Sequence, residues 1–276
     1  MTPLFSHEGR RELQRLARGN TLYAFDFDGT LAPIVADPAQ ARAADRVTRP
    51  LAQLARLVPV AVVSGRAQRD LIERLPCEIA YLVGNHGNEG LPEEPDAAAL
   101  EETSRRWRAS LTVQLLAPEA QGVRLEDKGR SLSLHYRAAP DPAGASGFLR
   151  SVAHALLPQP TVIDGKMVLN LLPPGAMTKF EALHILVQHE GVEHVLFVGD
   201  DDTDEIVFRR APGHWTTVRI DPHGETAARY CLDEQASIEI LLAHLLAEHA
   251  DDAHPALPPA DAPLEPRPAG RAGRRS

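Results

Sequence analysis

A short apolar run that ends in two carboxylates constrains this 276-residue chain more than any other feature. Residues 22–27 are mostly aromatic and aliphatic, which predicts a short buried strand rather than a helix. Gly29 and Thr30 then indicate a turn. Because ligands of open α/β sheets bind beyond the carboxyl ends of the strands, we expect Asp26 and Asp28 to project there.

The two carboxylates of this D-x-D-G-T motif suit phosphoryl transfer. They repel each other unless a cation lies between them or one stays protonated, and Mg²⁺ takes oxygen ligands of this kind. Asp26 could attack phosphorus to give an aspartyl-phosphate. Asp28 could protonate the leaving oxygen and later deprotonate the hydrolytic water. The alternative is an acidic turn in which Asp and Gly serve conformation alone.

The composition, 43% hydrophobic and 24% charged, is that of a soluble globular enzyme with material for about two domains. A net charge of -9 argues against nucleic acid and anionic membranes as main partners. No segment approaches 18 uninterrupted apolar residues, and residues 1–20 lack the apolar core of a signal peptide. Cys77 and Cys231 have neither metal-type spacing nor a disulfide framework. We therefore expect a cytoplasmic protein.

Two further apolar runs, residues 60–64 and 81–84, also deliver polar groups where a strand ends. Ser64 is a candidate to hydrogen-bond a phosphoryl oxygen, and it could equally cap a helix that begins a few residues later. His86 and Glu89 could meet a polar substrate, although a histidine in a glycine-rich turn is more often structural.

The pattern changes between residues 91 and 172, where we expect an α+β module inserted into an α/β core. We expect helices at residues 96–116 and 147–157. We also expect an antiparallel pair of strands at residues 123–126 and 131–136, and a hairpin at residues 161–172. The hairpin is expected to turn tightly at Asp164 and Gly165.

The alternating pattern resumes with a helix over residues 177–190 that Gly191 stops. Lys179 lies at its beginning, where the helix dipole does not stabilise a cation. An anionic partner outside the helix would explain this position, and so would simple solvent exposure. The remaining expected elements are helices at residues 47–58 and 236–249 and strands at residues 195–198 and 216–220. A disordered tail is expected over residues 251–276.

Five carboxylates lie within six residues directly after the strand at 195–198. Such a cluster is costly unless a cation or full solvation compensates its charge. A calcium EF-hand is one alternative, but Glu205 and Ala211 stand where that loop needs Gly and Glu. A solvated acidic loop is another. The chain contains no dinucleotide-binding, P-loop, serine-hydrolase or zinc-protease signature.

Taken together, these strand-end motifs resemble those of the haloacid dehalogenase superfamily. They are Asp26-Phe-Asp28-Gly-Thr30, Ser64, Lys179 and Gly199-Asp200-Asp201. The resemblance implies that Asp26 is the nucleophile, that Asp28 is the acid and base, and that Ser64 and Lys179 hold the phosphoryl group. It also implies a Mg²⁺ site built by the Asp26 carboxylate, the Asp28 carbonyl and the Asp200 carboxylate, supported by Asp201 and Asp204.

Within that superfamily the chain looks like a trehalose-6-phosphate phosphatase over about residues 21–246. The resemblance rests on Val63-Ser-Gly-Arg66, Gly84-Asn-His-Gly-Asn-Glu89, Lys128 with Ser131, Leu134-His-Tyr-Arg137, Gly165-Lys-Met-Val-Leu169 and Gly199-Asp-Asp-Asp-Thr-Asp-Glu205. It implies a Rossmann-like core at residues 1–88 and 175–250 and an α+β (C2-type) cap at residues 89–174. The implied substrate-binding residues are Gly65, Arg66, His86, Glu89, Lys128, His135, Arg137 and Asn170.

Two residues depart from that family's pattern. Asn170 stands where Glu is usual, and Phe180 stands where Gly is usual. Asn170 can hydrogen-bond sugar hydroxyls but brings no charge, and Phe180 is expected to fill a gap beneath the cap.

The leading hypothesis is a Mg²⁺-dependent phosphatase that hydrolyses trehalose 6-phosphate. The alternatives are a phosphatase of another sugar phosphate, a phosphomutase, and a catalytically silent partner of a trehalose-phosphate synthase. The expected ligand is a small sugar phosphate, and a synthase is a candidate protein partner.

Overall fold

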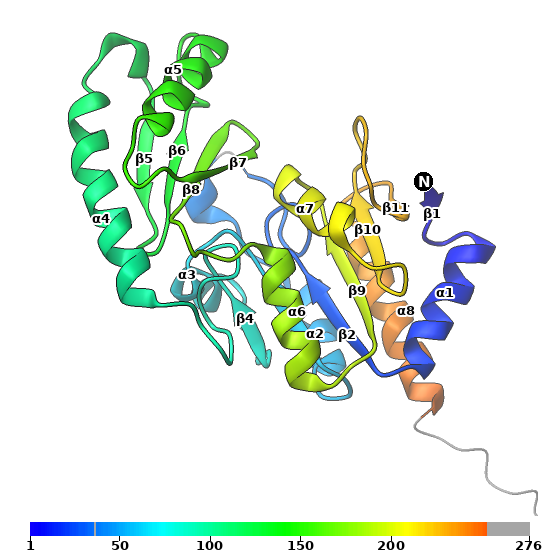
Figure 1. Ribbon diagram of the computed structural model, residues 1–276. Helices are drawn as coiled ribbons and strands as arrows, with labels where there is room; N and C mark the ends of the chain where they lie inside the picture. The colour runs from blue at the N-terminus through cyan, green and yellow to red at the C-terminus, as the bar shows by residue number, and fades with distance from the viewer. Residues whose placement is uncertain (36, 253–276) are drawn as a thin grey trace, which may run out of the picture.

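Two sheets organise the chain in a computed structural model that describes residues 1–35 and 37–252 (Figure 1). The predicted disordered tail lies, from residue 253 onward, outside the described residues. The larger sheet is parallel throughout, with strand order β1-β11-β10-β9-β2-β3-β4. Its strands are β1 (Thr2–Pro3), β2 (Thr21–Phe25), β3 (Val60–Val63), β4 (Tyr81–Val83), β9 (His194–Gly199), β10 (Thr216–Ile220) and β11 (Tyr230–Leu232).

Helices cover both faces of this sheet, which is why its strands are apolar on both sides. Along β2, Tyr23 and Phe25 face one apolar cluster, and Leu22 and Ala24 face the other. The first cluster includes side chains of α1 (His7–Arg18), α2 (Asp45–Leu54), α3 (Gln68–Arg74) and α8 (Ser237–Asp252). The second includes side chains of α6 (Lys179–Glu190) and α7 (Asp202–Arg210).

The smaller sheet, with order β5-β6-β8-β7, is antiparallel and forms the inserted layer, hereafter the cap. Its elements are α4 (Ala97–Gln114), β5 (Arg124–Asp127), β6 (Leu132–His135), α5 (Pro142–His154), β7 (Thr161–Gly165) and β8 (Val168–Leu172). Trp107 of α4 and Leu149 of α5 pack with Leu134 and Leu169 in a third apolar cluster. The predicted α+β module is confirmed, whereas the exact domain boundaries stay predictions.

The predicted turn of the β7–β8 hairpin was wrong by two residues. Gly165 pairs with Val168, so the turn consists of Lys166 and Met167, with Met167 at φ 62°. A turn at Asp164 and Gly165 would pair Thr161 with Val168 and leave Leu169–Leu172, the buried part of β8, without a partner in β7.

Four α-helices and strands went unrecognised in the sequence, namely α1, α7, β1 and β11, and so did two short 3-10 helices at Pro38–Gln40 and Pro118–Ala120. The acidic run at residues 200–205 forms the beginning of α7, where carboxylates complement the helix dipole. Asp201 and Asp204 form a capping box there.

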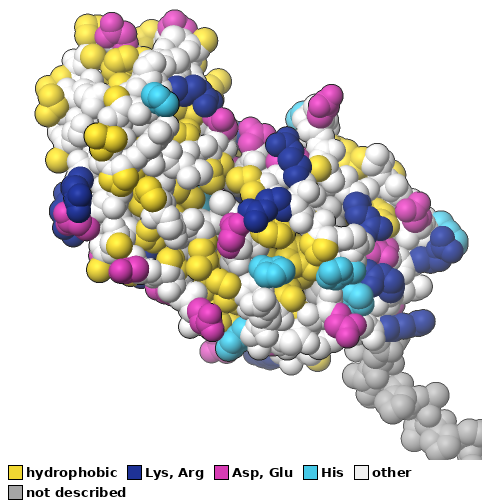
Figure 2. Space-filling view, viewed as in Figure 1, with side chains coloured by type: hydrophobic (Ala, Val, Ile, Leu, Met, Phe, Trp, Pro, Cys, Tyr) yellow, Lys and Arg dark blue, Asp and Glu magenta, His cyan; other side chains and the backbone are white. Residues whose placement is uncertain are grey.

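Charged side chains of both signs are interspersed over the face of the molecule in Figure 2. Across residues 1–35 and 37–252, no helix combines the length and apolarity needed to cross a bilayer. The cytoplasmic location stays a prediction.

Candidate active site

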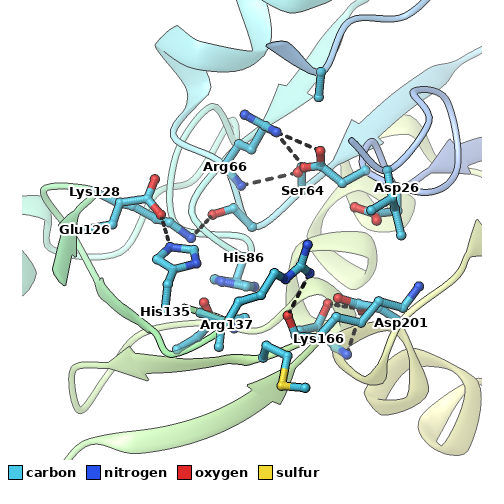
Figure 3. Close-up of a pocket in the computed structure, with 18 of the residues that line it drawn as sticks. Asp26, Ser64, Arg66, His86, Glu126, Lys128, His135, Arg137, Lys166 and Asp201 are labelled. Atoms are coloured by element: carbon cyan, nitrogen blue, oxygen red, sulfur yellow. Dashed lines mark hydrogen bonds and ion pairs between the residues drawn. The ribbon is translucent and has the colours of Figure 1, made fainter. Parts of the chain in front are cut away.

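A cavity of about 470 Å³ lies between the cap and the carboxyl ends of β2, β3 and β9 (Figure 3). The strand order places β9 on one side of β2 and β3 on the other, so the chain leaves β2 at a point where the direction of winding reverses. Open α/β sheets bind ligands at such a point. The core side contributes Asp26, Ser64 and Asp200, and the cap side contributes groups from β5, β6 and the β7–β8 hairpin.

The centre of the site is an ammonium group held between two buried carboxylates. Lys179 Nζ lies 2.8 Å from Asp26 Oδ1 and 2.8 Å from Asp204 Oδ1, and the lysine side chain is only 2% exposed. The predicted anionic partner of Lys179 is thus provided by the protein itself, and the solvent-exposure alternative is wrong. Burial raises the pKa of Asp26 well above its usual value, although Lys179 opposes that shift.

The acidic run after β9 is mostly inside the protein. Asp204 Oδ2 accepts hydrogen bonds from the backbone N–H groups of Asp200 at 2.9 Å and Asp201 at 3.1 Å. Asp201 Oδ1 accepts from the Thr203 N–H at 2.8 Å and from the Thr203 hydroxyl at 2.6 Å. Burial raises the pKa of Asp204 to about 7 and that of Asp200 to about 6. A fully solvated acidic loop is therefore excluded for Asp200 and Asp204.

Three carboxylates could hold a divalent cation. One oxygen each of Asp26, Asp200 and Asp204 lies within 4.8 Å of the others. Asp200 Oδ1 is buried without a hydrogen-bond partner in the described part of the chain, which is what a hard cation would complete. Both oxygens of Asp204 already accept hydrogen bonds, so its contribution includes positioning the loop. Ligation by Asp201 and by the Asp28 carbonyl stays a prediction.

Gly29 allows the two acidic segments to approach each other. Its φ is +80°, and a Cβ there would lie 2.1 Å from Asp200 Oδ2. A side chain at this position would displace the carboxylate from the candidate metal site.

Asp28 lies at the cavity wall in a two-pronged ion pair with Arg66. Arg66 Nε and an Nη donate to its two oxygens at 2.6 and 2.7 Å, and Arg66 also binds Asp70 at 2.6 Å. The Asp28 side chain is 40% exposed, unlike the buried Asp26. Arg66 therefore orients the candidate acid and base.

Ser64 is buried, lines the cavity, and its oxygen accepts from the Arg66 N–H at 3.3 Å. It does not cap α3, because that helix begins at Gln68 and Glu89 accepts the Gln68 N–H at 2.7 Å. Glu89 also accepts from Asn85 at 3.0 Å and does not line the cavity. The geometry gives Glu89 a capping role, and substrate contact by this residue stays a prediction.

His86 lines the cavity as a buried, neutral imidazole. Its backbone lies in the left-handed region at φ 61°, and its ring covers Gly65 so closely that a Cβ there would meet His86 Cε1 at 2.5 Å. Burial lowers its pKa to about 3, the Asn170 side chain opposes that shift, and neither ring nitrogen makes a well-directed hydrogen bond in the described residues. Unpaired buried polar groups cost about 1–3 kcal/mol. Substrate contact by His86 stays a prediction.

The cap supplies cationic groups to the same cavity. Lys128 Nζ donates to the Gly65 carbonyl at 2.8 Å, and burial lowers its pKa. His135 Nε2 lies 2.6 Å from a carboxylate oxygen of Glu126, and the exposed Arg137 also lines the cavity. Figure 3 shows these side chains on the cap side of the space above Asp26.

The two residues that depart from the family pattern have different positions. Asn170 lines the cavity and accepts a hydrogen bond from Ser133 Oγ at 2.7 Å. Phe180 does not lie beneath the cap, so that expectation was wrong. Its ring centroid lies 5.8 Å from that of Trp215, and it packs against the apolar cluster of α6 and α7, because burial there removes the ring from water.

Several residues that line the cavity were missed in the sequence, among them Arg124, Glu126, Thr203 and Lys166. Lys166, at the hairpin turn, places Nζ 2.6 Å from Asp200 Oδ2. Its only sequence signal was membership of the Gly165–Leu169 motif, and the misplaced turn concealed that its side chain reaches the core.

Known proteins resemble this chain in sequence and in architecture. A family model described as trehalose-phosphatase matches residues 24–234. The trehalose-phosphate phosphatase of Mycobacterium avium (strain 104) is 34% identical over an alignment 233 residues long, which covers 77% of this chain and 58% of that protein. The chain thus spans less than two thirds of the length of the curated relatives it matches first.

Solved structures agree in fold. A trehalose-6-phosphate phosphatase of Aspergillus fumigatus aligns with a TM-score of 0.60 at 28% identity over 90% of this chain and 99% of that one. The C-terminal domain of the C. albicans enzyme aligns with a TM-score of 0.70 at 24% identity, over 90% and 98%. The predicted core and cap of the haloacid dehalogenase fold are confirmed. With the family model matching well over half of its length, the chain belongs to the trehalose-phosphatase family.

Proposed function

We propose that the chain is a phosphoric monoester hydrolase that converts trehalose 6-phosphate to trehalose and phosphate, with Mg²⁺ as cofactor and an aspartyl-phosphate on Asp26. The observation that carries this proposal is the convergence of Asp26, Lys179 and Asp200 at one end of a cavity whose other wall bears cationic cap residues. A phosphate monoester fits such a cavity because its dianion needs cations on several sides.

The first step in this proposal forms a bond between an Asp26 carboxylate oxygen and phosphorus and breaks the bond from phosphorus to the sugar oxygen. Asp28 gives its proton to that sugar oxygen, so the sugar leaves as a neutral alcohol. In the second step a water molecule gives a proton to Asp28 and attacks phosphorus, which releases phosphate and restores Asp26.

The remaining core residues position these groups. Lys179 and Ser64 would hold phosphoryl oxygens, and Arg66 would orient Asp28 through the ion pair described above. Mg²⁺ held by Asp26 and Asp200 would offset the repulsion between the nucleophile and the phosphate dianion.

The cap residues would recognise the substrate. Lys128, His135 and Arg137 surround the space above Asp26, and Gly65, Arg66 and His86 border it from the core. Closure of this cap would exclude bulk water during the reaction and reopening would release the sugar.

A direct test measures phosphate release from trehalose 6-phosphate with and without Mg²⁺. Asp26→Asn should lower kcat by more than about 1,000-fold, because the nucleophile is lost. Asp45→Asn, which changes an exposed carboxylate of α2, is the matched control and should retain full activity. Full turnover by Asp26→Asn, with mass spectrometry excluding deamidation back to Asp, would refute the mechanism.

Another sugar phosphate, such as sucrose 6-phosphate or a glycosyl-glycerate phosphate, is a second candidate substrate. Asn170 motivates it, because its carbonyl oxygen already accepts from Ser133 and the residue brings no charge to the cavity. Comparing kcat/KM over a panel of sugar phosphates decides between them. The trehalose assignment is rejected if another member of the panel is preferred.

Two further alternatives are distinguished by the same reaction. Transfer of the phosphoryl group to a second sugar instead of water would identify a phosphomutase. Sugar-phosphate binding without turnover would identify a silent partner of a trehalose-phosphate synthase. Association with such a synthase stays a prediction, and analytical ultracentrifugation of the two proteins together would test it.

A further inference from the structure

The turn of the β7–β8 hairpin reaches from the cap into the candidate metal site. Lys166 Nζ lies 2.6 Å from Asp200 Oδ2, and Figure 3 shows this side chain beside the acidic loop that carries Asp201. The turn itself is fixed, because the Tyr136 N–H donates to the Met167 carbonyl at 3.1 Å and Arg137 donates to the Lys166 carbonyl at 3.3 Å.

Asp200 depends on this contact. Its side chain is 4% exposed, its Oδ1 has no partner in the described part of the chain, and Lys166 is the cation paired with its Oδ2. Asp26 and Asp204, in contrast, share Lys179, which α6 holds inside the core. Of these three carboxylates, Asp200 is thus the one whose negative charge is balanced by a cation of the cap.

The two lysines differ in how easily they can leave. Lys179 is 2% exposed and has two carboxylate partners, whereas Lys166 is 47% exposed and has one. An ammonium group on a flexible stem at the solvent boundary regains its hydration when it moves away. Lys166 can therefore exchange with another cation at Asp200, and Lys179 cannot without opening the core.

We propose that Lys166 and the divalent cation compete for Asp200, so that metal binding releases the β7–β8 hairpin from the core. The inference rests on the metal site of the proposed function. The physical reason is that a divalent cation on the unpaired Oδ1 of Asp200 repels, at short range, the ammonium group that Lys166 holds on Oδ2 of the same carboxylate. Metal loading and the position of the hairpin are then linked equilibria, and each shifts the other by the same factor.

The first experiment measures Mg²⁺ binding by isothermal titration calorimetry with MgCl₂ and no substrate. Lys166→Met should lower the Kd for Mg²⁺ about threefold to tenfold, because a partly exposed ion pair no longer competes. Lys166→Arg should keep a Kd near that of the wild type. Lys166→Gln is measured in parallel, and thermal unfolding establishes that each variant is folded.

Lys128→Met is the matched control. Lys128 is also a cap lysine that reaches the core, but its Nζ binds the Gly65 carbonyl and no candidate metal ligand. Its loss should leave the Kd for Mg²⁺ within about twofold of the wild type. An equal gain in affinity in Lys128→Met and Lys166→Met would overturn the proposal, because a general loss of cap charge would explain both.

The second experiment follows hydrogen exchange of the hairpin amides at residues 164–168. In the wild type, Mg²⁺ should speed exchange there, and in Lys166→Met exchange should be fast with or without Mg²⁺. Exchange that Mg²⁺ slows or leaves unchanged in the wild type would contradict the release of the hairpin.

The two experiments separate failure of this inference from failure of the proposed function. A wild-type protein that binds Mg²⁺ and releases phosphate, with an unchanged Kd in Lys166→Met, overturns only the competition. No Mg²⁺ binding by any of these proteins overturns the metal site and the competition together.

Discussion

Replacing Lys179 by Met removes the cation that two buried carboxylates share. The free energy of unfolding should fall by roughly 3–5 kcal/mol at pH 8, the usual cost of breaking a buried pair by deleting one partner. Three features of the structure support a loss of this size: both contacts are 2.8 Å, Lys179 is 2% exposed, and Asp204 is fully buried. For a chain of this size such a loss lowers Tm by about 10 °C.

The loss should depend on pH in a defined direction. Without Lys179, the pKa values of Asp26 and Asp204 rise further above those of an unfolded chain, which lie near 4. Above about pH 4 the folded variant therefore binds protons that its unfolded chain does not, and its stability falls as pH rises until both folded carboxyls ionise. The deficit relative to the wild type should be smallest below about pH 7, where the carboxyls of both folded proteins hold protons, and should grow above it, where Asp204 of the wild type ionises first.

Urea unfolding at pH 4.5, 6 and 8 in EDTA measures this difference. Arg49→Met, which removes an ion pair on the solvent-exposed face of α2, is the control and should change stability little at any pH. The double variant Lys179→Met/Asp26→Asn should recover part of the loss, because one of the repelling carboxylates is gone. A deficit below about 1 kcal/mol at pH 8, or one that does not vary with pH, would refute the reasoning.

Three further predictions concern the same site. His86→Leu should leave the stability in urea unchanged or raised by up to about 1 kcal/mol, because it removes unpaired buried nitrogens. Its kcat/KM should fall about 10- to 100-fold. A large loss of stability would instead show that the His86 ring serves the fold. Gly29→Ala should weaken Mg²⁺ binding in calorimetry by at least about tenfold, since its Cβ would meet Asp200. The control is Gly175→Ala, where φ is +85° and nothing lies within 4 Å of the added Cβ. It should lose stability only through backbone strain and should keep the wild-type affinity for Mg²⁺. The metal-free wild type should lose stability in urea between about pH 4 and 7, because native Asp200 and Asp204, with pKa values of about 6 and 7, hold protons that the unfolded chain has released. Saturating Mg²⁺ should flatten this dependence. A stability that rises over this range would contradict the assignment.

Much of the fold was predictable because its signals are local. Apolar runs of four to six residues with polar groups at their ends indicate parallel strands buried on both faces, and the carboxyl ends of such strands meet at one edge. Asp26 and Asp200 could therefore be placed together although they lie 174 positions apart in the sequence. The change of pattern in the middle of the chain likewise indicated the cap.

Other features could not be predicted because they depend on which side chains meet across distant segments. Glu89 carries the same chemistry as a substrate ligand, but its distance from the cavity and its bond to the Gln68 N–H follow from the packing of β4 against α3. The run of carboxylates at α7 gave a metal signal that concealed a helix beginning at the same residues.

The sequence by itself determined most of the elements, their order and the set of chemical groups at the strand ends, because burial periodicity and strand direction are properties of short segments. Only the tertiary structure decided that Lys179 lies between Asp26 and Asp204, that His86 stays unpaired, and that Lys166 reaches Asp200. The physical reason is that an ion pair or an unpaired nitrogen is fixed by the mutual position of core and cap, to within about an ångström, and no local pattern of residues encodes that position.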